Sequence, residues 1–267
     1  MDAKEPAKPD GSGRVAAARR AVSDQYATDA NLRARINLHQ RFSTAKEDWH
    51  RWLFDRVAPS AGARILEVGF GPAEFWTRNL ERIDPTWQLT LTDLSPGMIE
   101  AAREVIQERA DYAVADVQKL PFADESFDVV LASHMLYHVS DRPKALAEIR
   151  RVLVSGGVLH AAANGRGHMR QLDELVGEDW EFAWHGKAFG LESGIPLLEA
   201  SFVDVTEERQ ESGLAVTEVE PLVAYVASSS TFSGDIECIR RRAQEEFERE
   251  GVFRIDAHPG VLHARKA

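Results

Sequence analysis

Short apolar segments alternate with helical segments between residues 64 and 164, and this alternation constrains the fold more than any other feature of the chain. The apolar segments have the length of strands, and the segments between them carry the spacing of amphipathic helices. Strands that alternate with helices in this way form a parallel sheet through right-handed crossovers, with helices on both faces. We therefore predict a doubly wound α/β domain up to Asn164. Its predicted strands are 64–68, 87–92, 112–115, 127–132 and 157–163, and its predicted helices are 73–82, 96–108 and 142–153.

The segments outside this alternation are predicted to cover the domain and to complete its sheet. Two amphipathic helices are expected between residues 29 and 58, separated at Ser43 and Thr44. After residue 165 we expect a strand at 202–210, helices at 217–228 and 235–250, and closing strands at 252–255 and 260–264. The predicted organisation is a flexible tail at 1–20, a helical cover at 21–58, a core at 59–165, a lid at 166–251 and closing strands of the core at 252–267.

Composition excludes several classes of protein. The single cysteine, Cys238, excludes an internal disulfide framework and a cysteine-cluster metal site. The net charge of −11 argues against a nucleic-acid partner, because such a partner requires a cationic surface. Apolar runs are too short for a membrane span, and the N-terminus lacks the apolar core of a secretory signal. We therefore expect a cytoplasmic protein that binds neither nucleic acid nor membrane.

The loop after the first predicted strand points to a ligand that is not a diphosphate. Gly69 and Gly71 allow the backbone to approach a ligand closely. A dinucleotide-binding fingerprint requires a third glycine at position 74, where this chain has Glu74. Glu74 and Glu67 place carboxylates on both sides of the loop, where they would repel a pyrophosphate but attract a cation.

Two further acids follow the second and third predicted strands. Asp93 is placed to accept hydrogen bonds from both hydroxyls of a ribose. Asp116 is placed to accept one from the amine of an adenine, with Val117 offering a backbone N–H. Each acid alone is equally typical of a turn or a helix cap, whereas three acids at the ends of three successive strands favour a shared ligand site.

Four segments of the chain resemble the class I S-adenosylmethionine-dependent methyltransferases, in particular the small-molecule branch that includes the ubiquinone/menaquinone-type and natural-product enzymes. The segments are residues 65–73 (ILEVGFGPA), 91–98 (LTDLSPGM), 120–130 (LPFADESFDVV) and 148–157 (EIRRVLVSGG). The resemblance covers residues 63–165 well and 166–251 hardly at all. The chain departs from the family at Ala73, where the family motif has its last glycine.

The resemblance implies a Rossmann-like, mostly parallel seven-stranded sheet with N-terminal helices and a helical lid insertion. It implies S-adenosylmethionine as cofactor and methyl transfer to O, N or C of a small molecule in specialised or cofactor metabolism. A nicotinamide-dependent oxidoreductase, and a protein that binds S-adenosylmethionine without transfer activity, remain as alternatives. The implied cofactor-binding residues are Glu67, Gly69, Phe70, Gly71, Asp93, Leu94, Met98, Asp116, Val117 and Ser133.

The segment after the fourth predicted strand holds the candidate catalytic residues. His138 matches the position of a catalytic histidine in related enzymes, with Tyr137 beside it, and a histidine is a suitable base near neutral pH. An equally good interpretation is that His138 packs in the following turn. His134 and His138 have helical metal-ligand spacing but no evident third ligand, so no metal is expected. A homodimer is left open. Further candidates for the acceptor pocket, against turn-forming or packing roles, are His134, Asn164, His168, Trp180 and Trp184.

Overall fold

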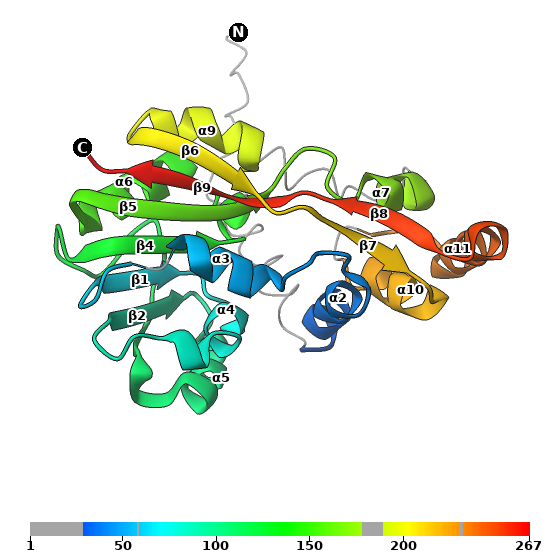
Figure 1. Cartoon of the computed structure of the whole chain (residues 1–267), viewed down its shortest axis with the longest axis horizontal. Helices are drawn as coiled ribbons and strands as arrows, with labels where there is room; N and C mark the ends of the chain where they lie inside the picture. The colour runs from blue at the N-terminus through cyan, green and yellow to red at the C-terminus, as the bar shows by residue number, and fades with distance from the viewer. Residues whose placement is uncertain (1–28, 58, 178–188, 230–231) are drawn as a thin grey trace, which may run out of the picture.

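A seven-stranded sheet organises the larger part of the molecule (Figure 1). The computed structural model describes residues 29–57, 59–177, 189–229 and 232–267. The strand order β3-β2-β1-β4-β5-β9-β6, with only β9 antiparallel to both of its neighbours, confirms the predicted mostly parallel seven-stranded sheet. The strands are β1 (Arg64–Val68), β2 (Gln88–Asp93), β3 (Asp111–Val114), β4 (Phe127–Ser133), β5 (Leu153–Asn164), β6 (Val203–Arg209) and β9 (Pro259–Arg265).

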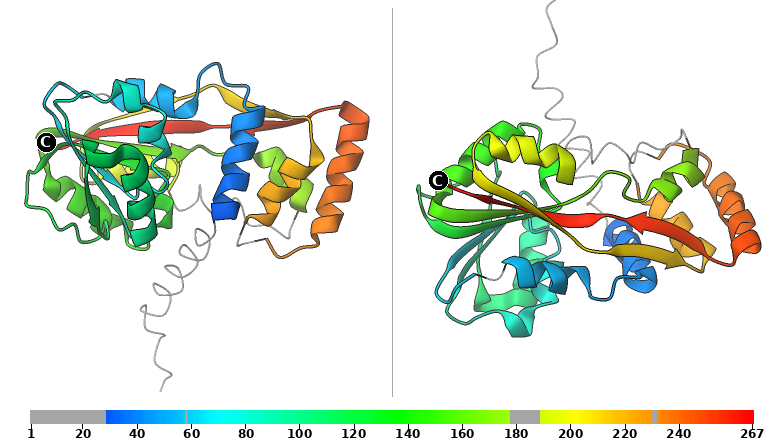
Figure 2. Two further views of the ribbon diagram at one scale, coloured as in Figure 1. Left: turned by 90° about the horizontal axis from the view of Figure 1, so that it is seen from below. Right: turned by 45° about the horizontal axis from the view of Figure 1, so that its top comes forward.

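Helices cover both faces of this sheet, as the doubly wound prediction requires (Figure 2). One face packs against α3 (Trp49–Val57), α4 (Glu74–Thr77) and α5 (Pro96–Ile106), and the other packs against α6 (Arg142–Val152) and α9 (Leu191–Glu199). Strand β4 shows the alternation that builds two cores, since Leu131 faces the first layer and Val130 the second. Short 3-10 turns lie at η1 (Leu80–Arg82), η2 (Gln107–Arg109) and η3 (Leu136–His138).

The remaining elements form a second lobe with a core of its own. It contains α2 (Asp29–Phe42), α7 (Arg170–Val176), β7 (Ser212–Val216), α10 (Val219–Ala227), α11 (Ile236–Glu250) and β8 (Phe253–Ala257). Strands β7 and β8 pair with each other in a two-stranded sheet. Figure 1 shows that the path from β6 to β7 and the path from β8 to β9 run side by side between the two lobes.

The part of the chain after β5 differs from the prediction in three respects. Strand β7 was not expected, and β8, expected among the closing strands of the core, pairs with β7 and does not join the large sheet. Helix α9 and strand β6, which lie within the predicted lid at 166–251, pack on and extend the large sheet. The apolar pattern reveals that a segment is a strand, but the partner of the strand depends on contacts between segments that are distant in sequence.

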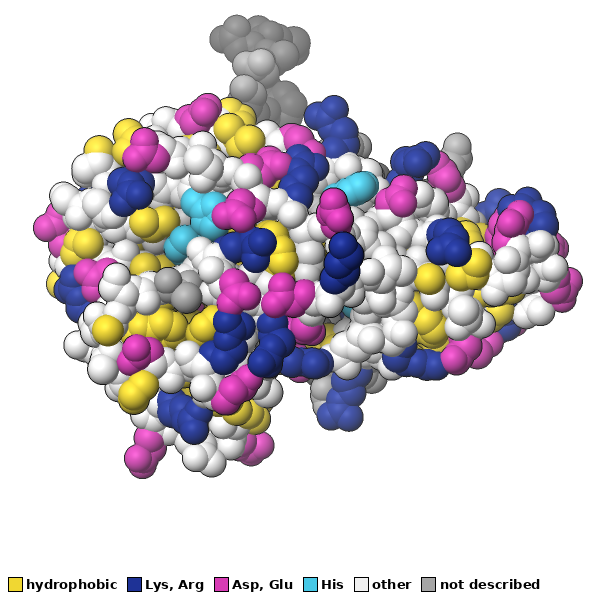
Figure 3. Space-filling view, in the orientation of Figure 1, with side chains coloured by type: hydrophobic (Ala, Val, Ile, Leu, Met, Phe, Trp, Pro, Cys, Tyr) yellow, Lys and Arg dark blue, Asp and Glu magenta, His cyan; other side chains and the backbone are white. Residues whose placement is uncertain are grey.

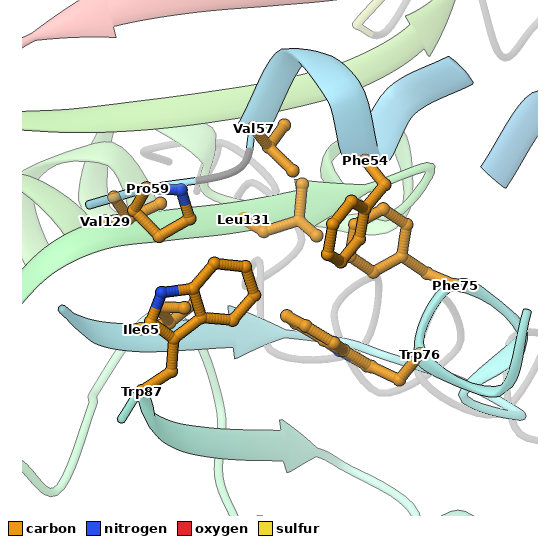
Figure 4. A pocket seen from close by; sticks show the side chains of 9 residues that line it. All are labelled: Phe54, Val57, Pro59, Ile65, Phe75, Trp76, Trp87, Val129 and Leu131. Atoms are coloured by element: carbon orange, nitrogen blue, oxygen red, sulfur yellow. The ribbon is translucent and has the colours of Figure 1, made fainter. Parts of the chain in front are cut away.

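A small cavity lies beneath α3 (Figure 4). Its volume is about 10 Å³, and its lining includes the aromatic rings of Phe54, Phe75, Trp76 and Trp87. A cavity of this size is at the lower limit for a single water molecule, and an apolar wall offers such a water few partners. The cavity is therefore a gap in the packing of the core and is unsuited to binding a cofactor.

Two histidines meet across the antiparallel pair of β5 and β9. His160 faces His263 in the strand register, and the Nδ1 atoms of the two rings lie 2.6 Å apart. The Nε2 atom of His263 lies 3.4 Å from Glu208 on β6, and Glu208 accepts a hydrogen bond from Arg56 on α3 at 3.0 Å. Burial is the first cause that lowers the pKa of both imidazoles, and their mutual repulsion lowers that of His160 further. In the folded state the pair is therefore neutral, with one ring donating to the other.

Acid should destabilise the fold through this pair. Because both pKa values are lowered from 6.5, the unfolded chain takes up protons first, so the stability is complete above pH 6.5 and is lost as the pH falls below it. The variant His160→Asn keeps a polar partner for His263 but does not titrate at this position. Denaturant unfolding between pH 7.5 and pH 4.5 should show that the variant loses less free energy of unfolding than the wild type, by about 1.4 kcal/mol per pH unit. Parallel curves for the two proteins would show that the pair carries no such penalty.

Candidate active site

The candidate site lies at the carboxyl ends of β1, β2, β3 and β4, where the chain order of the large sheet reverses between β1 and β4. Parallel registers bring three predicted acids to this edge. Glu67 is the fourth residue of β1, Asp93 ends β2, and Asp116 follows β3 by two residues. Asp93 and Glu67 are close enough that the charge of Asp93 raises the pKa of Glu67. The sheet thus brings together residues that the sequence separates by almost fifty positions.

The loop after β1 is held in an unusual backbone conformation. Gly69, Gly71 and Ala73 all have positive φ angles, of 64°, 58° and 56°. A Cβ atom at Gly69 would lie 3.0 Å from Cβ of Met135, so this loop packs directly against the segment that follows β4. At Gly71 a Cβ atom would meet no atom of the described residues within 4 Å. At Gly69 the loop therefore has no room for a side chain, because Met135 lies against it, whereas at Gly71 there is space beside the backbone.

The Asp93 side chain holds this loop against the end of β2 through hydrogen bonds. Its Oδ2 atom accepts a hydrogen bond from the backbone N–H of Gly71 at 3.0 Å, and its Oδ1 atom accepts one from Ser95 at 2.8 Å. Ser95 in turn caps α5 by accepting from the backbone N–H of Met98. One carboxylate therefore connects the glycine loop, the end of β2 and the start of α5, and its remaining lone pairs are available to a ligand.

The Glu67 side chain lies beneath the loop and is not exposed at the edge of the site. Its side chain is 1 % exposed and accepts a short hydrogen bond from Nε1 of Trp76. Burial raises the pKa of the Glu67 carboxyl to about 8, although the Trp76 bond opposes this shift. The carboxyl therefore holds a proton at neutral pH, and the three predicted acids do not carry three charges in this structure.

The other predicted cofactor residues border the same edge of the sheet in different ways. Leu94 is 53 % exposed and Met98 is half-buried near the loop. Asp116 accepts hydrogen bonds from the backbone and side chain of Gln118, at 2.9 and 3.0 Å. The side chains of Phe70 and Val117 are buried in the two cores, so their backbone is the part that a ligand can reach. Ser133, the last residue of β4, is half-buried.

The predicted catalytic pair lies in the turn after β4. Tyr137 and His138 belong to η3, and their rings contact each other edge to face at 4.4 Å between centroids. Asn164 ends β5, where it pairs with Pro259 of β9. Trp180 and Trp184 lie outside the residues that the structure describes. The geometry therefore leaves the role of His138 as a prediction.

A cluster of histidines lies at the junction of the two lobes, and sequence reasoning found only part of it. His134 follows β4, and its ring contacts Trp49 of α3 with 5.4 Å between centroids. His168 accepts a hydrogen bond at Nδ1 from the backbone N–H of His258 at 3.0 Å, and its ring stacks on His39 of α2 at 6.4 Å. His39 was not predicted, because it belongs to a helix whose apolar spacing indicated only packing.

Comparison with known proteins identifies the core of the chain. Residues 66–161 match the family described as Methyltransferase domain. This segment resembles that family, and the match covers less than half of the chain. The ubiquinone/menaquinone biosynthesis C-methyltransferase UbiE of Dinoroseobacter shibae is 37 % identical over 127 residues, which cover 46 % of this chain and 48 % of the relative. The chain thus spans about half the length of the curated relatives that it matches, and the resemblance to class I methyltransferases is confirmed for the core.

Solved structures share the fold over a longer stretch. The [4+2]-cyclase SpnF covers 93 % of this chain and 95 % of its own, with a TM-score of 0.60 and 19 % identity. A phosphoethanolamine N-methyltransferase 2 of Haemonchus contortus, solved with phosphomonomethylethanolamine and S-adenosylhomocysteine, covers 93 % of this chain and 60 % of its own, with a TM-score of 0.59 and 20 % identity. At these identities the comparison establishes the Rossmann-like fold alone.

Two features are absent from the residues that the structure describes. Within them, no group of three or more histidine, cysteine or acidic side chains is arranged to hold a metal ion. Of the helices that the structure describes, none combines the length and the apolar character that a membrane span requires.

The two glycines of the loop should respond differently to a methyl group. Gly69→Ala should lower the free energy of unfolding by about 2–4 kcal/mol, because it adds a clash with Met135 to the cost of a positive φ angle. Gly71→Ala has the same kind of backbone but open space, and should cost about 1 kcal/mol. Denaturant unfolding of the two variants measures the difference. Equal losses would mean that the loop does not pack against Met135.

Proposed function

We propose that this protein transfers a methyl group from S-adenosylmethionine to a small-molecule acceptor. The observation that carries the proposal is the meeting of the open glycine loop with Asp93 and Asp116 at the ends of adjacent parallel strands, beside the segment that follows β4. The methyltransferase family of the core supports the proposal, as does the presence of S-adenosylhomocysteine in a structure of the same fold.

The residues of the loop fit this cofactor. The space above Gly71, where a side chain would meet no described atom, leaves the backbone accessible. Asp93 has lone pairs free for the ribose hydroxyls, and Asp116 is placed for the amine of the adenine. Leu94 and Met98 offer apolar surface for the adenine ring between these two acids. When bound, S-adenosylmethionine supplies a methyl group that is already activated by a positively charged sulfur.

The contribution of the protein is mainly to hold the reactants. Displacement on an activated methyl group requires alignment of the donor and the acceptor, and fixed geometry supplies most of the rate gain in such reactions. Asp93 fixes the loop, and the contact of Gly69 with Met135 fixes the distance between that loop and the residues after β4. A neutral hydroxyl acceptor also needs a base, for which the histidines after β4 are the candidates.

The alternatives fit the site less well. A nicotinamide dinucleotide would bring its pyrophosphate to a loop flanked by the acids Glu74 and Asp93. The loop also lacks a long helix whose N-terminus could bind a pyrophosphate, because α4, which follows Ala73 and its positive φ angle, has only four residues. A protein that binds the cofactor without transferring methyl is the other alternative, since a chain of the same fold, SpnF, is named a cyclase and the fold therefore does not fix the reaction. Incubation of the protein with radiolabelled methyl donor and a metabolite extract distinguishes a methyltransferase from a protein that only binds the cofactor, because only a methyltransferase labels an acceptor.

The net charge of the chain bears on its partners. We propose that the protein acts in the cytoplasm on a small molecule and does not bind nucleic acid, which the net charge of −11 supports. The proposal leaves room for a homodimer, which light scattering would detect.

Asp93 should be essential for cofactor affinity. Asp93→Ala removes the acceptor of the ribose hydroxyls and releases Gly71, so titration calorimetry should show that S-adenosylmethionine binds about 10–100-fold more weakly. The matched control is Asp111→Ala, which removes an exposed carboxylate at the opposite end of β3 and should change the affinity less than about twofold. Binding of NAD in place of S-adenosylmethionine by the wild type would favour the oxidoreductase.

Cofactor binding should release a proton from Glu67. Its pKa of about 8 means that the carboxyl is protonated at pH 7, and a bound cation nearby lowers this pKa. Calorimetry with S-adenosylmethionine at pH 7, in two buffers of different ionisation enthalpy, should therefore show release of up to about one proton per cofactor. The variant Glu67→Gln should show none, and its affinity should lose the rise between pH 7 and pH 9 that we expect of the wild type. Identical proton release by both proteins would assign the proton to another group.

A further inference from the structure

The Gln118 side chain connects two parts of the chain that border the candidate site. Its Nε2 atom donates to Oδ1 of Asp116 at 3.0 Å and lies 3.3 Å from Oδ2 of the same carboxylate. Its Oε1 atom accepts hydrogen bonds from the hydroxyl of Ser140 and from the backbone N–H of Asp141, both at 3.2 Å. Asp116 follows β3, whereas Ser140 and Asp141 lie between η3 and α6. One amide thus joins the acid after β3 to the segment after β4.

This connection requires a donor at one end and an acceptor at the other. The ionised carboxylate of Asp116 only accepts hydrogen bonds, so it must face the nitrogen of the amide. The backbone N–H of Asp141 only donates, so it must face the amide oxygen. These two requirements fix the orientation of the Gln118 amide, because its oxygen and nitrogen cannot exchange places without losing both sets of bonds. A carboxyl group at this position would lose the donor, and an apolar side chain would lose donor and acceptor alike.

The Asp116 carboxylate is therefore held in one orientation. The backbone N–H of Gln118 also donates to its Oδ1 atom, at 2.9 Å. The backbone N–H of Lys119 donates to the carbonyl of Asp116 at 2.8 Å, which closes the turn. The two donors of Gln118 use both lone pairs of Oδ1, so a further donor, such as the amine of a ligand, is directed to Oδ2. A carboxylate fixed in this way needs little reorganisation when a ligand binds.

We propose that Gln118 is the positioning residue of the adenine site, and that it makes this protein select adenine over hypoxanthine in the methyl donor. This inference rests on the proposed function, in which Asp116 accepts a hydrogen bond from the amine of the adenine. Hypoxanthine carries a carbonyl oxygen where adenine carries that amine. A carboxylate oxygen accepts from the amine but repels the carbonyl oxygen at the same place. The selection is therefore as sharp as the orientation of the carboxylate, which the Gln118 amide sets.

The neutral charge of the amide is part of this role. A lysine or arginine side chain in contact with the carboxylate would also orient it, but would offset the negative charge that attracts the amine of the ligand. An amide donates hydrogen bonds and adds no charge. Gln118 contacts no reacting atom in this scheme, and its effect on the cofactor passes through Asp116.

The test compares two cofactor products that differ only at this position of the purine. S-adenosylhomocysteine carries the amino group, and S-inosylhomocysteine carries the carbonyl oxygen. Titration calorimetry at pH 7 should show that the wild type binds S-adenosylhomocysteine at least about tenfold more tightly, because the carbonyl oxygen meets an acceptor where the amine meets a partner.

The informative variant is Gln118→Glu, because it keeps the length of the side chain and an oxygen that accepts from Ser140 and Asp141. It replaces the donor to Asp116 with a second carboxyl group, and two carboxyl groups in contact share a proton. The shared proton can be donated to a carbonyl oxygen, so the preference for S-adenosylhomocysteine should fall to about twofold or less. Gln118→Asn, which is neutral but one methylene shorter, should lower the preference in the same direction.

The matched control is Gln88→Glu. It makes the same chemical change at the exposed first residue of β2, at the opposite edge of the large sheet. The preference of this variant for S-adenosylhomocysteine should stay within about twofold of that of the wild type.

The outcomes separate this inference from the proposed function. If wild-type protein does not bind S-adenosylhomocysteine, the proposed function is wrong. If it binds this ligand but shows no preference over S-inosylhomocysteine, or if Gln118→Glu keeps the full preference, the inference alone is wrong. A loss of affinity for both ligands by the same factor in Gln118→Glu would assign Gln118 a purely structural role in the loop, and would also overturn the inference.

Discussion

The carboxylate of Asp93 is the contact on which the geometry of the site depends. It joins the backbone N–H groups of Gly71 and Ser95, and so holds the glycine loop to the start of α5. This bond exists because β1 and β2 are parallel and in register, which places the ends of both strands at one edge of the sheet. Thr92 strengthens the same connection by donating from Oγ1 to the backbone carbonyl of Glu67 at 3.0 Å. A shift of this register would separate the loop from Asp93.

The central strands of the large sheet were predictable because they are buried on both faces. Strands such as β1 and β4 read as short continuous apolar runs, and the predicted 64–68 agrees with β1 at both ends. The helix predicted at 73–82 is shorter, since Ala73 adopts a positive φ angle and α4 contains only Glu74–Thr77 before η1. Strand β7 escaped prediction because Ser212–Val216 is short and contains Gly213, and its partner lies about forty residues away.

The candidate site was predictable where it depends on one strand and its following loop. Asp93 and the two glycines could be found because their positions relative to the strands are fixed by local structure. The protonated state of Glu67 could not be found, because it results from burial beside Trp76. The same applies to His39, whose neighbour His168 is 129 positions away in the sequence and meets it only where the lobes join. Tertiary contacts of this kind leave no local pattern.

The two lobes differ in how far the match to the methyltransferase family reaches into them. The match to the methyltransferase family ends at residue 161, within β5, and so contains the glycine loop and all three acids but neither His39 nor His168. The elements that bring these two histidines to the site, α2 and the segment after β5, lie outside the matched segment, and α2 packs in the core of the second lobe. Fold neighbours named as a cyclase and as an N-methyltransferase share the sheet, so the sheet does not select the acceptor. The placement of His39 and His168 therefore depends on parts of the chain that the family match does not include.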